Sequence, residues 1–207
     1  MLSARLYDAA LRRVERQQLG AWRKELLADV SGDVLEIGAG TGANLPLYRP
    51  GVRHLILLEP DPAMRTRLAP RSAGLTGPAQ VVLAGSASRL PLATASIDAV
   101  VSTLVLCSIH RLDHALAELR RVLRPGGALF LIEHVAATGG SRLRRAQHVL
   151  SPAWSRVAGG CSLERPTRQL LTGAGFDVSD VHDDLLQVPL PLLRPALRGV
   201  ARPLPTT

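Results

Sequence analysis

Apolar residues along the chain gather into short runs, and segments with helical spacing separate most of these runs. The first segment, residues 6–30, places Leu, Ala and Val side chains among many charges at roughly helical intervals, and it ends at Ser31-Gly32-Asp33. Seven short apolar runs follow, and we predict them to be β-strands: residues 34–37, 54–58, 81–83, 97–102, 128–132, 176–181 and 199–202. We expect the last run to form an edge strand.

Helical periodicity recurs over residues 64–69, 112–123, 141–158 and 166–173. Asp61-Pro62 suits a helix start, and Pro125-Gly126-Gly127 should end the second helix. Strands that alternate with helices imply βαβ units, so we predict an α/β fold with a doubly wound, mostly parallel seven-stranded sheet and an N-terminal helix. The proline-rich residues 188–195 fit either a linker between the last two strands or a low-complexity tail, and closure of the sheet favours the linker.

Length and composition narrow the class of protein. The 207 residues fit one domain, and the formal net charge of +8 comes mainly from arginine. Aromatic residues make up only 3%, which argues against stacking platforms for nucleic acid, and the arginines are scattered apart from residues 142–145. Two cysteines make no disulfide framework, and we find neither a signal peptide nor a membrane-spanning run of about 18 apolar residues. We therefore expect a cytoplasmic protein.

A glycine turn, Gly38-x-Gly40-x-Gly42, follows the first predicted strand. Glycines allow a tight turn and a close approach of a ligand to the backbone. We expect a helix to begin directly after the turn, so that its N-terminus binds an anionic group of the ligand. Glu59 ends the second strand, at the spacing expected of a carboxylate that binds ribose hydroxyls.

The same glycines also satisfy the dinucleotide fingerprint, because Ala43 can stand as its last small residue. Three features argue against a nicotinamide enzyme. Glu36 puts a carboxylate beside the turn, where it would repel a pyrophosphate and attract a cationic ligand. The chain is too short for a second, substrate-binding domain, and its only lysine, Lys24, has no tyrosine four residues before it.

Together these residues resemble the class I S-adenosylmethionine-dependent methyltransferases, a family with a Rossmann-like fold. The motifs stand in that family's order at residues 36–42, 59–60, 86–92, 96–102 and 121–127. Within the family, the chain is similar to the animal methyltransferase-like alkyl thiol methyltransferases over residues 103–108, 133–137, 151–154 and 160–163. The resemblance implies S-adenosylmethionine as the cofactor, S-adenosylhomocysteine as its product and a small-molecule thiol as the methyl acceptor.

The resemblance also implies roles for individual residues and regions. Residues 1–31 should form a helical lid, 32–135 the cofactor-binding core, and 136–207 the substrate-side helices and last strands. Glu59 should bind the ribose, Pro60 and Met64 the adenine, and Thr103 and Leu104 should border the sulfonium. The remaining residues expected at the cofactor are Tyr7, Glu36, Gly38, Ala39, Gly40, Gly42, Asn44, Ser86 and Ala87.

The chain departs from the relatives' pattern in two places. The animal proteins carry an N-terminal membrane anchor, whereas this chain starts at its first helix. Many relatives place an acidic residue after the third strand, where this chain has Ser86, so the adenine contact should come from Ser86 or from backbone.

Acceptor chemistry points to residues after the fourth and fifth predicted strands. Methyl transfer is an in-line displacement, and a thiol acceptor must first become a thiolate. We take His134 as the candidate base, because histidine titrates near neutral pH, although a structural role remains the alternative. Cys107, His110, Trp154 and Cys161 are candidates for the substrate pocket, with core packing as the alternative for the cysteines and the tryptophan.

We do not expect a metal, because His110 and His114 share the spacing of a ligand pair but lack the rest of a metal motif. The acceptor can also be a nitrogen, an oxygen or a ring carbon of a lipid-like or quinone-like molecule. A protein that binds the cofactor without turnover is the alternative from another class.

Overall fold

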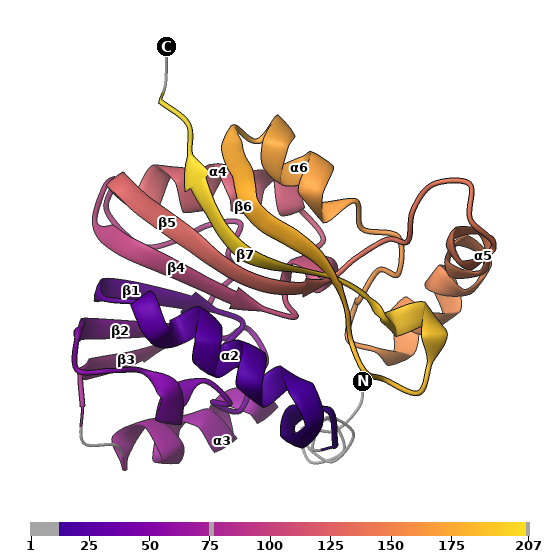
Figure 1. Ribbon diagram of the computed structural model, residues 1–207. Helices are drawn as coiled ribbons and strands as arrows, with labels where there is room; N and C mark the ends of the chain where they lie inside the picture. The colour runs from indigo at the N-terminus through magenta and orange to yellow at the C-terminus, as the bar shows by residue number, and fades with distance from the viewer. Residues whose placement is uncertain (1–12, 75–76, 206–207) are drawn as a thin grey trace.

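A seven-stranded sheet forms the centre of the computed structural model, which describes residues 13–74 and 77–205 (Figure 1). The strand order is β3-β2-β1-β4-β5-β7-β6, and β7 runs antiparallel to both of its neighbours. The strands are β1 (Gly32–Ile37), β2 (Val52–Leu58), β3 (Ala79–Leu83), β4 (Ile97–Thr103), β5 (Leu123–His134), β6 (Phe176–Leu185) and β7 (Pro195–Pro203). The predicted doubly wound, mostly parallel sheet is confirmed.

Helices cover both faces of the sheet. They are η1 (Glu15–Leu19), α2 (Gly20–Leu26), η2 (Leu27–Asp29), η3 (Leu45–Leu47), α3 (Pro62–Ala73), η4 (Leu106–Ser108), α4 (Leu112–Val122), α5 (Arg142–Val157), α6 (Thr167–Gly173) and η5 (Pro191–Leu193). Among the described residues, no helix is long and apolar enough to cross a membrane. In Figure 1, α5 lies apart from the sheet, beyond the carboxyl ends of the central strands.

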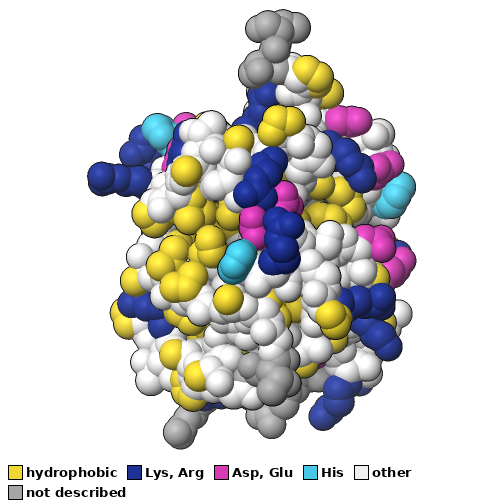
Figure 2. All heavy atoms as spheres, turned by 90° about the vertical axis from the view of Figure 1, so that its left-hand side faces the viewer, with side chains coloured by type: hydrophobic (Ala, Val, Ile, Leu, Met, Phe, Trp, Pro, Cys, Tyr) yellow, Lys and Arg dark blue, Asp and Glu magenta, His cyan; other side chains and the backbone are white. Residues whose placement is uncertain are grey.

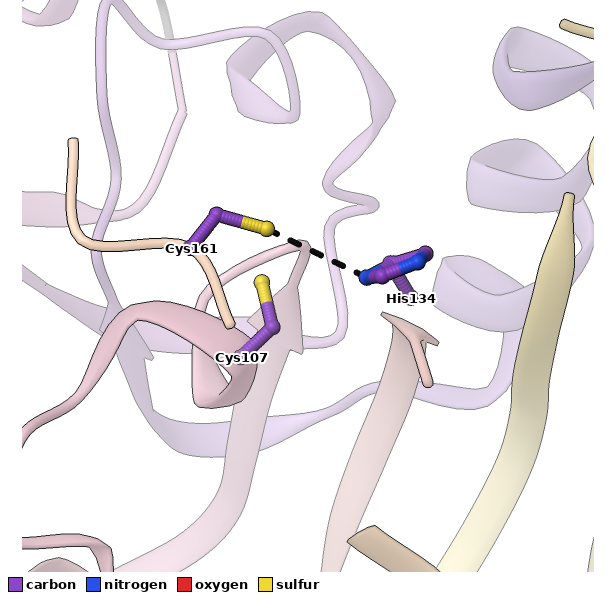
Figure 3. Close-up of side chains that lie close together, drawn as sticks. All are labelled: Cys107, His134 and Cys161. Atoms are coloured by element: carbon purple, nitrogen blue, oxygen red, sulfur yellow. Dashed lines mark hydrogen bonds between the residues drawn. The ribbon is translucent and has the colours of Figure 1, made fainter. Parts of the chain in front are cut away.

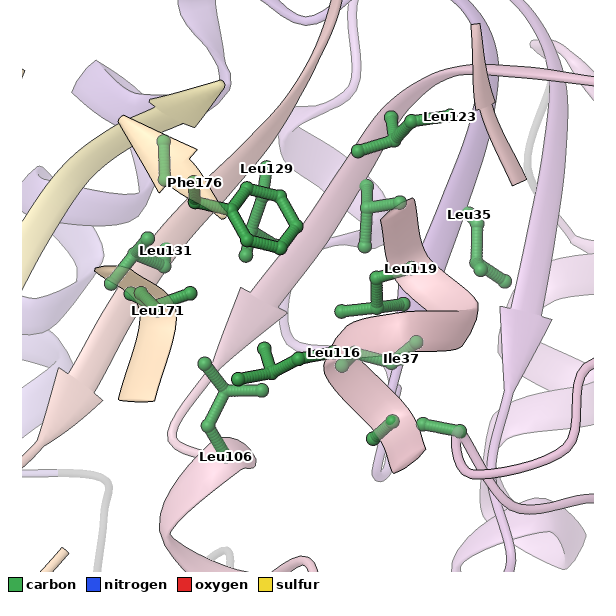
Figure 4. Packing of buried hydrophobic residues seen from close by; sticks show 14 of the residues in the cluster. Leu35, Ile37, Leu106, Leu116, Leu119, Leu123, Leu129, Leu131, Leu171 and Phe176 are labelled. Carbon is green, nitrogen blue, oxygen red and sulfur yellow. The ribbon is translucent and has the colours of Figure 1, made fainter. Parts of the chain in front are cut away.

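Alternation along the strands divides the core into two layers. Leu35 and Ile37 of β1 pack with α4 and α6 on one face, where Phe176 lies against Leu129 and Leu171 (Figure 4). On the opposite face, Val34 packs with η2 and with Leu68 of α3. Glu36 follows Val34 at a spacing of two residues, so its side chain belongs to this second face, beneath the N-terminal helix.

Two predicted boundaries are wrong. Pro125-Gly126-Gly127 does not separate a helix from a strand, because β5 already begins at Leu123 and pairs there with Ile97. The next pair in the register is Ala99 with Ala128, so the Pro-Gly-Gly segment is accommodated as a bulge. In α3, the helix continues past Pro70 to Ala73, because a proline in the last turns removes one hydrogen bond without ending the helix.

The predicted edge position of the last strand is also wrong. β7 lies between β5 and β6, and the edge strand is β6. The insertion of β7 depends on Gly199, whose φ is +141° and where a Cβ would lie 2.0 Å from the Asp180 carbonyl oxygen. Residues 188–195 connect the two strands through η5, as the linker interpretation predicts.

Charged residues tie together the strands where the sheet begins. Asp33 of β1 accepts Arg53 Nη2 at 3.1 Å, His54 Nδ1 at 2.7 Å and Arg124 Nη1 at 2.9 Å. Asp98 of β4 binds the same two arginines. Figure 2 looks onto this side of the molecule and shows side chains of both charges together near its centre. These bonds hold the pKa of Asp33 well below its usual range, His54 and Arg53 contributing most.

We predict that Asp33→Asn lowers the free energy of unfolding by about 1 kcal/mol at neutral pH, because a networked carboxylate is lost. A carboxyl group whose pKa is lowered by folding stabilises the protein above its unfolded pKa of about 4, and this contribution disappears as the pH falls. Urea denaturation at several pH values measures the difference. The exposed Asp29→Asn should show no such loss, and a pH-independent deficit in Asp33→Asn would contradict the electrostatic explanation.

Candidate active site

The glycine turn after β1 has the backbone geometry of a ligand cradle. Gly38 and Gly40 have φ of +59° and +58°, a conformation that residues with a Cβ rarely adopt. A Cβ on Gly38 would lie 2.5 Å from a Val105 methyl group, whereas one on Gly40 would meet nothing closer than 3.9 Å. The turn therefore packs tightly against the β4–α4 connection at Gly38 and leaves open space above Gly40.

The helix expected directly after the turn is absent. Residues 41–44 form turns and bends, and only the single 3-10 turn η3 follows before β2. Pro46 and Pro50 interrupt this short connection, which leaves no room for a longer helix. A single turn provides no substantial helix dipole, so a negative group of a ligand must find its positive partner elsewhere.

Arg23 of α2 supplies that positive charge. Its side chain is buried beneath the N-terminal helix, and Nη1 donates to Asn44 Oδ1 at 2.8 Å and to Thr103 Oγ1 at 2.6 Å. Its Nε donates to Glu15 at 3.1 Å. Sequence analysis did not single out Arg23. The sequence did contain a signal for its burial. Leu19, Arg23 and Leu27 follow one another at intervals of four residues, so their side chains share one face of the helical segment, and both leucines are buried.

Glu36 lies on the other side of Asn44. One carboxylate oxygen accepts Asn44 Nδ2 at 2.9 Å, and the other accepts the Tyr48 hydroxyl at 2.8 Å. Burial raises the pKa of Glu36 to about 7, although these hydrogen bonds and the charge of Arg23 oppose the shift. Asn44 thus bridges a buried cation and a buried acid whose protonation changes near neutral pH.

Glu59, at the end of β2, is held by backbone donors. Gly40 N donates to Oε2 and Asp61 N donates to Oε1, each at 2.8 Å. Burial raises the pKa of Glu59, against the effect of these two bonds. The adjoining Pro60 is exposed, and Met64, in the first turn of α3, is half-buried.

The other residues expected at the cofactor differ in their exposure and in their hydrogen bonds. Ser86 is exposed, and its hydroxyl accepts Ser88 N at 3.3 Å. Ala39 and Ala87 pack with their side chains in the two core layers. The backbone of Ala39 already donates to the Leu58 carbonyl and accepts from Gly42 N. Tyr7 lies outside the described residues.

The chain turns sharply where β4 ends. Leu104 has φ of +61°, an uncommon conformation for a residue with a Cβ, and its N–H donates to the Ile132 carbonyl at 2.7 Å. Glu133, fully buried, accepts Ser102 Oγ at 2.6 Å and Val105 N at 3.0 Å. Burial raises the pKa of Glu133 to about 7, against these bonds. Sequence analysis included Glu133 only within residues 133–137, one of the segments that resemble the thiol methyltransferases.

Cys107, His134 and Cys161 come together beyond this turn, on the side toward α5 (Figure 3). They follow β4, end β5 and follow α5 respectively, and their sulfur and nitrogen atoms lie within 4.8 Å of one another. His110 is exposed and is not part of this cluster. Trp154, on α5, has a buried indole N–H that meets no hydrogen-bond acceptor among the described residues.

The two thiols of this cluster are not equivalent. A hydrogen bond from Cys107 lowers the pKa of Cys161 below its ordinary value, against the effect of burial. The same bond, together with burial, raises the pKa of Cys107. The hydrogen bond between the two sulfur atoms therefore makes Cys161 the more acidic of the two thiols.

Comparison with known proteins places this arrangement in a family. The family model of the methyltransferase domain matches residues 35–131. The chain is 38% identical to human thiol S-methyltransferase TMT1B over 81% of this chain and 72% of the relative, and 37% identical to human thiol S-methyltransferase TMT1A over 91% and 81%.

A crystal structure of a SAM-dependent methyltransferase from Thermotoga maritima shares the fold. Its TM-score is 0.65 at 23% sequence identity, and the match covers 96% of this chain and 94% of that one. The identity and coverage of the human relatives show that the chain belongs to the class I methyltransferases, close to the thiol S-methyltransferase group.

Proposed function

We propose that this enzyme transfers the methyl group of S-adenosylmethionine to the sulfur of a small-molecule thiol. The cluster of Cys107, His134 and Cys161 at the carboxyl ends of β4 and β5 carries the proposal, because it places thiol and imidazole groups where open α/β sheets bind ligands. The printed names of the human relatives support the same acceptor. The bound cofactor would supply an electrophilic methyl group on a sulfonium, and the protein aligns the acceptor with it.

Arg23 and Glu36 match the two charges of an amino-acid group. The carboxylate of the methionyl portion would pair with Arg23 and its ammonium with Glu36, with Asn44 between them. Open space above Gly40 admits the ligand between this pair and Glu59. Thr103 and Leu104 then border the sulfonium from the end of β4.

Glu59 would bind the ribose hydroxyls. Gly40 N and Asp61 N orient its two carboxylate oxygens, and each oxygen retains a lone pair for a further donor. Pro60 and Met64 would flank the adenine, and Ser86 or the Ala87 backbone would contact its edge.

The N-terminal residues 1–31 act in this proposal as a lid over the cofactor-binding core, residues 32–135. The buried contacts of Arg23 with Asn44 and Thr103 support it, since they join the N-terminal helix to the glycine turn and to β4. Tyr7 would belong to the same lid. Residues 136–207 would form the acceptor side.

The acceptor thiol must lose its proton before it attacks. His134 is the candidate base, because its Nδ1 faces the cluster, 3.9 Å from Cys161 Sγ. Trp154 would form an apolar wall for the acceptor, and His110 would lie toward the entrance.

Release of S-adenosylhomocysteine from purified protein, measured with a panel of thiols, phenols and amines, tests the acceptor. We predict turnover with thiols only, rising with pH until the acceptor, whose pKa is about 8.5, is fully a thiolate. Mass spectrometry should identify the methyl thioether. Turnover confined to phenols or amines would refute the thiol acceptor, and cofactor binding without turnover on any acceptor would refute the enzyme.

A second prediction concerns the pH dependence of cofactor binding. The raised pKa of Glu36, about 7, means that this group is protonated below neutral pH and cannot pair with the ammonium. Affinity for S-adenosylhomocysteine, measured by calorimetry, should therefore rise about tenfold between about pH 6 and about pH 8. Glu36→Gln should flatten this rise, whereas the exposed Glu25→Gln should preserve it. An unchanged slope in Glu36→Gln would contradict the assignment.

Arg23→Met tests the lid. Methionine keeps the buried apolar stem but removes the guanidinium, so affinity for S-adenosylhomocysteine should fall ten- to hundredfold, or about 1.4–2.8 kcal/mol. Arg16→Met, on the exposed side of the same helical segment, should bind like the parent. Equal affinities in Arg23→Met and the parent, with both folded by circular dichroism, would remove Arg23 from the site.

A further inference from the structure

His134 has the hydrogen-bond partners of a metal ligand. Its Nε2 lies 3.1 Å from the Leu192 carbonyl oxygen, which can only accept, so the ring proton is on Nε2. The lone pair of Nδ1 therefore points at Cys161 Sγ, 3.9 Å away. Metal-binding histidines characteristically donate their other ring N–H to such an acceptor, which fixes the tautomer and the ring plane.

The two cysteines are held side by side by their backbones. Ser162 N donates to the Cys107 carbonyl at 2.9 Å, and Arg165 Nη2 donates to the same oxygen at 3.3 Å. These bonds join η4 to the segment that follows α5. Gln147 Nε2 donates to the Leu192 carbonyl at 3.0 Å, so the partner of His134 is also anchored.

The three ligand atoms nearly fit a zinc ion. They lie within 4.8 Å of one another, whereas Zn–S bonds of about 2.3 Å and Zn–N bonds of about 2.0 Å set tetrahedral ligands roughly 3.5–3.8 Å apart. A contraction of each pair by about 1.3 Å at most closes the site. Three protein ligands leave the fourth tetrahedral position of a zinc ion for a further ligand. Cys107 and His134 are buried, and Cys161 is half-buried, so the cluster is not sealed from solvent at Cys161.

We propose that Cys107, His134 and Cys161 bind a zinc ion whose fourth coordination position takes the acceptor thiol. Two cysteines and one histidine with an open position are typical of catalytic rather than structural zinc sites. The ion would take over the activation that the proposed function assigns to His134 as a base, and this inference rests on that function.

Each turnover of the proposed reaction transfers one methyl group to the acceptor thiol and releases one proton. Zinc binding displaces the thiol protons of the two cysteines to the solvent, and the two thiolates neutralise the charge of the ion. The acceptor thiol gives its proton to zinc-bound hydroxide, which leaves as water while the thiolate binds. The bound thiolate then forms a bond to the methyl carbon as the carbon–sulfur bond of the sulfonium breaks, and that electron pair stays on the cofactor sulfur. The neutral methyl thioether is a weak ligand and leaves, and water binds the ion in its place. This water gives one proton to the solvent, which regenerates the zinc-bound hydroxide.

Cobalt titration tests the site without turnover. With a phosphine reductant, which is not itself a thiol, we expect one Co²⁺ per chain, tetrahedral visible bands and sulfur-to-cobalt charge transfer. Competition with a chelator should show that Cys107→Ser and Cys161→Ser each weaken Zn²⁺ binding by about a hundredfold or more. His148→Ala, an exposed histidine on α5, should bind as the parent does.

Addition of an acceptor thiol should shift the cobalt bands, and removal of zinc should abolish thiol turnover until zinc is restored. Absence of stoichiometric metal binding in folded, reduced protein would overturn the inference, and full thiol turnover in that metal-free protein would leave the proposed function standing. Bound cobalt whose visible bands do not respond to thiols would also overturn the inference, because the ion would then be structural.

Discussion

Glu133, fully buried one residue before the end of β5, accepts the Ser102 hydroxyl and the Val105 backbone N–H, and these two bonds fix the turn in which β4 ends. The turn holds Leu104 at positive φ, a conformation that the chain adopts only when its surroundings impose it. The direction of the chain on each side of Leu104 follows from this constraint. Thr103 lies against Arg23, and Cys107 lies beside His134 and Cys161.

The proposed cofactor site contains two buried ionisable side chains, Arg23 and Glu36, whose burial is not explained by a contribution to stability. Arg23 and Glu36 lie on either side of Asn44, which donates to the acid and accepts from the guanidinium. Burial of such groups costs free energy even when they are hydrogen-bonded, so they are expected where a ligand uses them. A zwitterionic amino-acid group is the ligand that this pair complements.

Much of the fold follows from local patterns. The apolar runs identify all seven strands, and Asp61-Pro62 identifies the start of α3, where Asp61 accepts Ala63 N at 2.7 Å. The position of β7 was not predictable, because it depends on the approach of Gly199 to the β6 backbone, a contact between segments rather than a feature of either one. The bulge at the start of β5 was not predictable either, because it arises in the pairing of β5 with β4.

The candidate site could be predicted from the sequence where its residues are local, and not where they come from distant elements. Glu36, Gly40 and Glu59 lie on or beside strand ends, and motif spacing indicated all three. Arg23 was missed because a charged residue on an amphipathic helix is normally read as solvent-exposed, although its register with Leu19 and Leu27 marks it as buried. The predicted helix after the glycine turn does not form, because Pro46 and Pro50 interrupt the segment.

If both proposals hold, the cofactor and the cysteine–histidine cluster face one another across the end of β4. A crystal structure of the protein with S-adenosylhomocysteine decides whether they do. We predict that the amino-acid group lies between Arg23 and Glu36 and that the sulfur atom faces Cys107, His134 and Cys161, with room between them for one acceptor sulfur. A cofactor sulfur that protein atoms separate from this cluster would refute this arrangement.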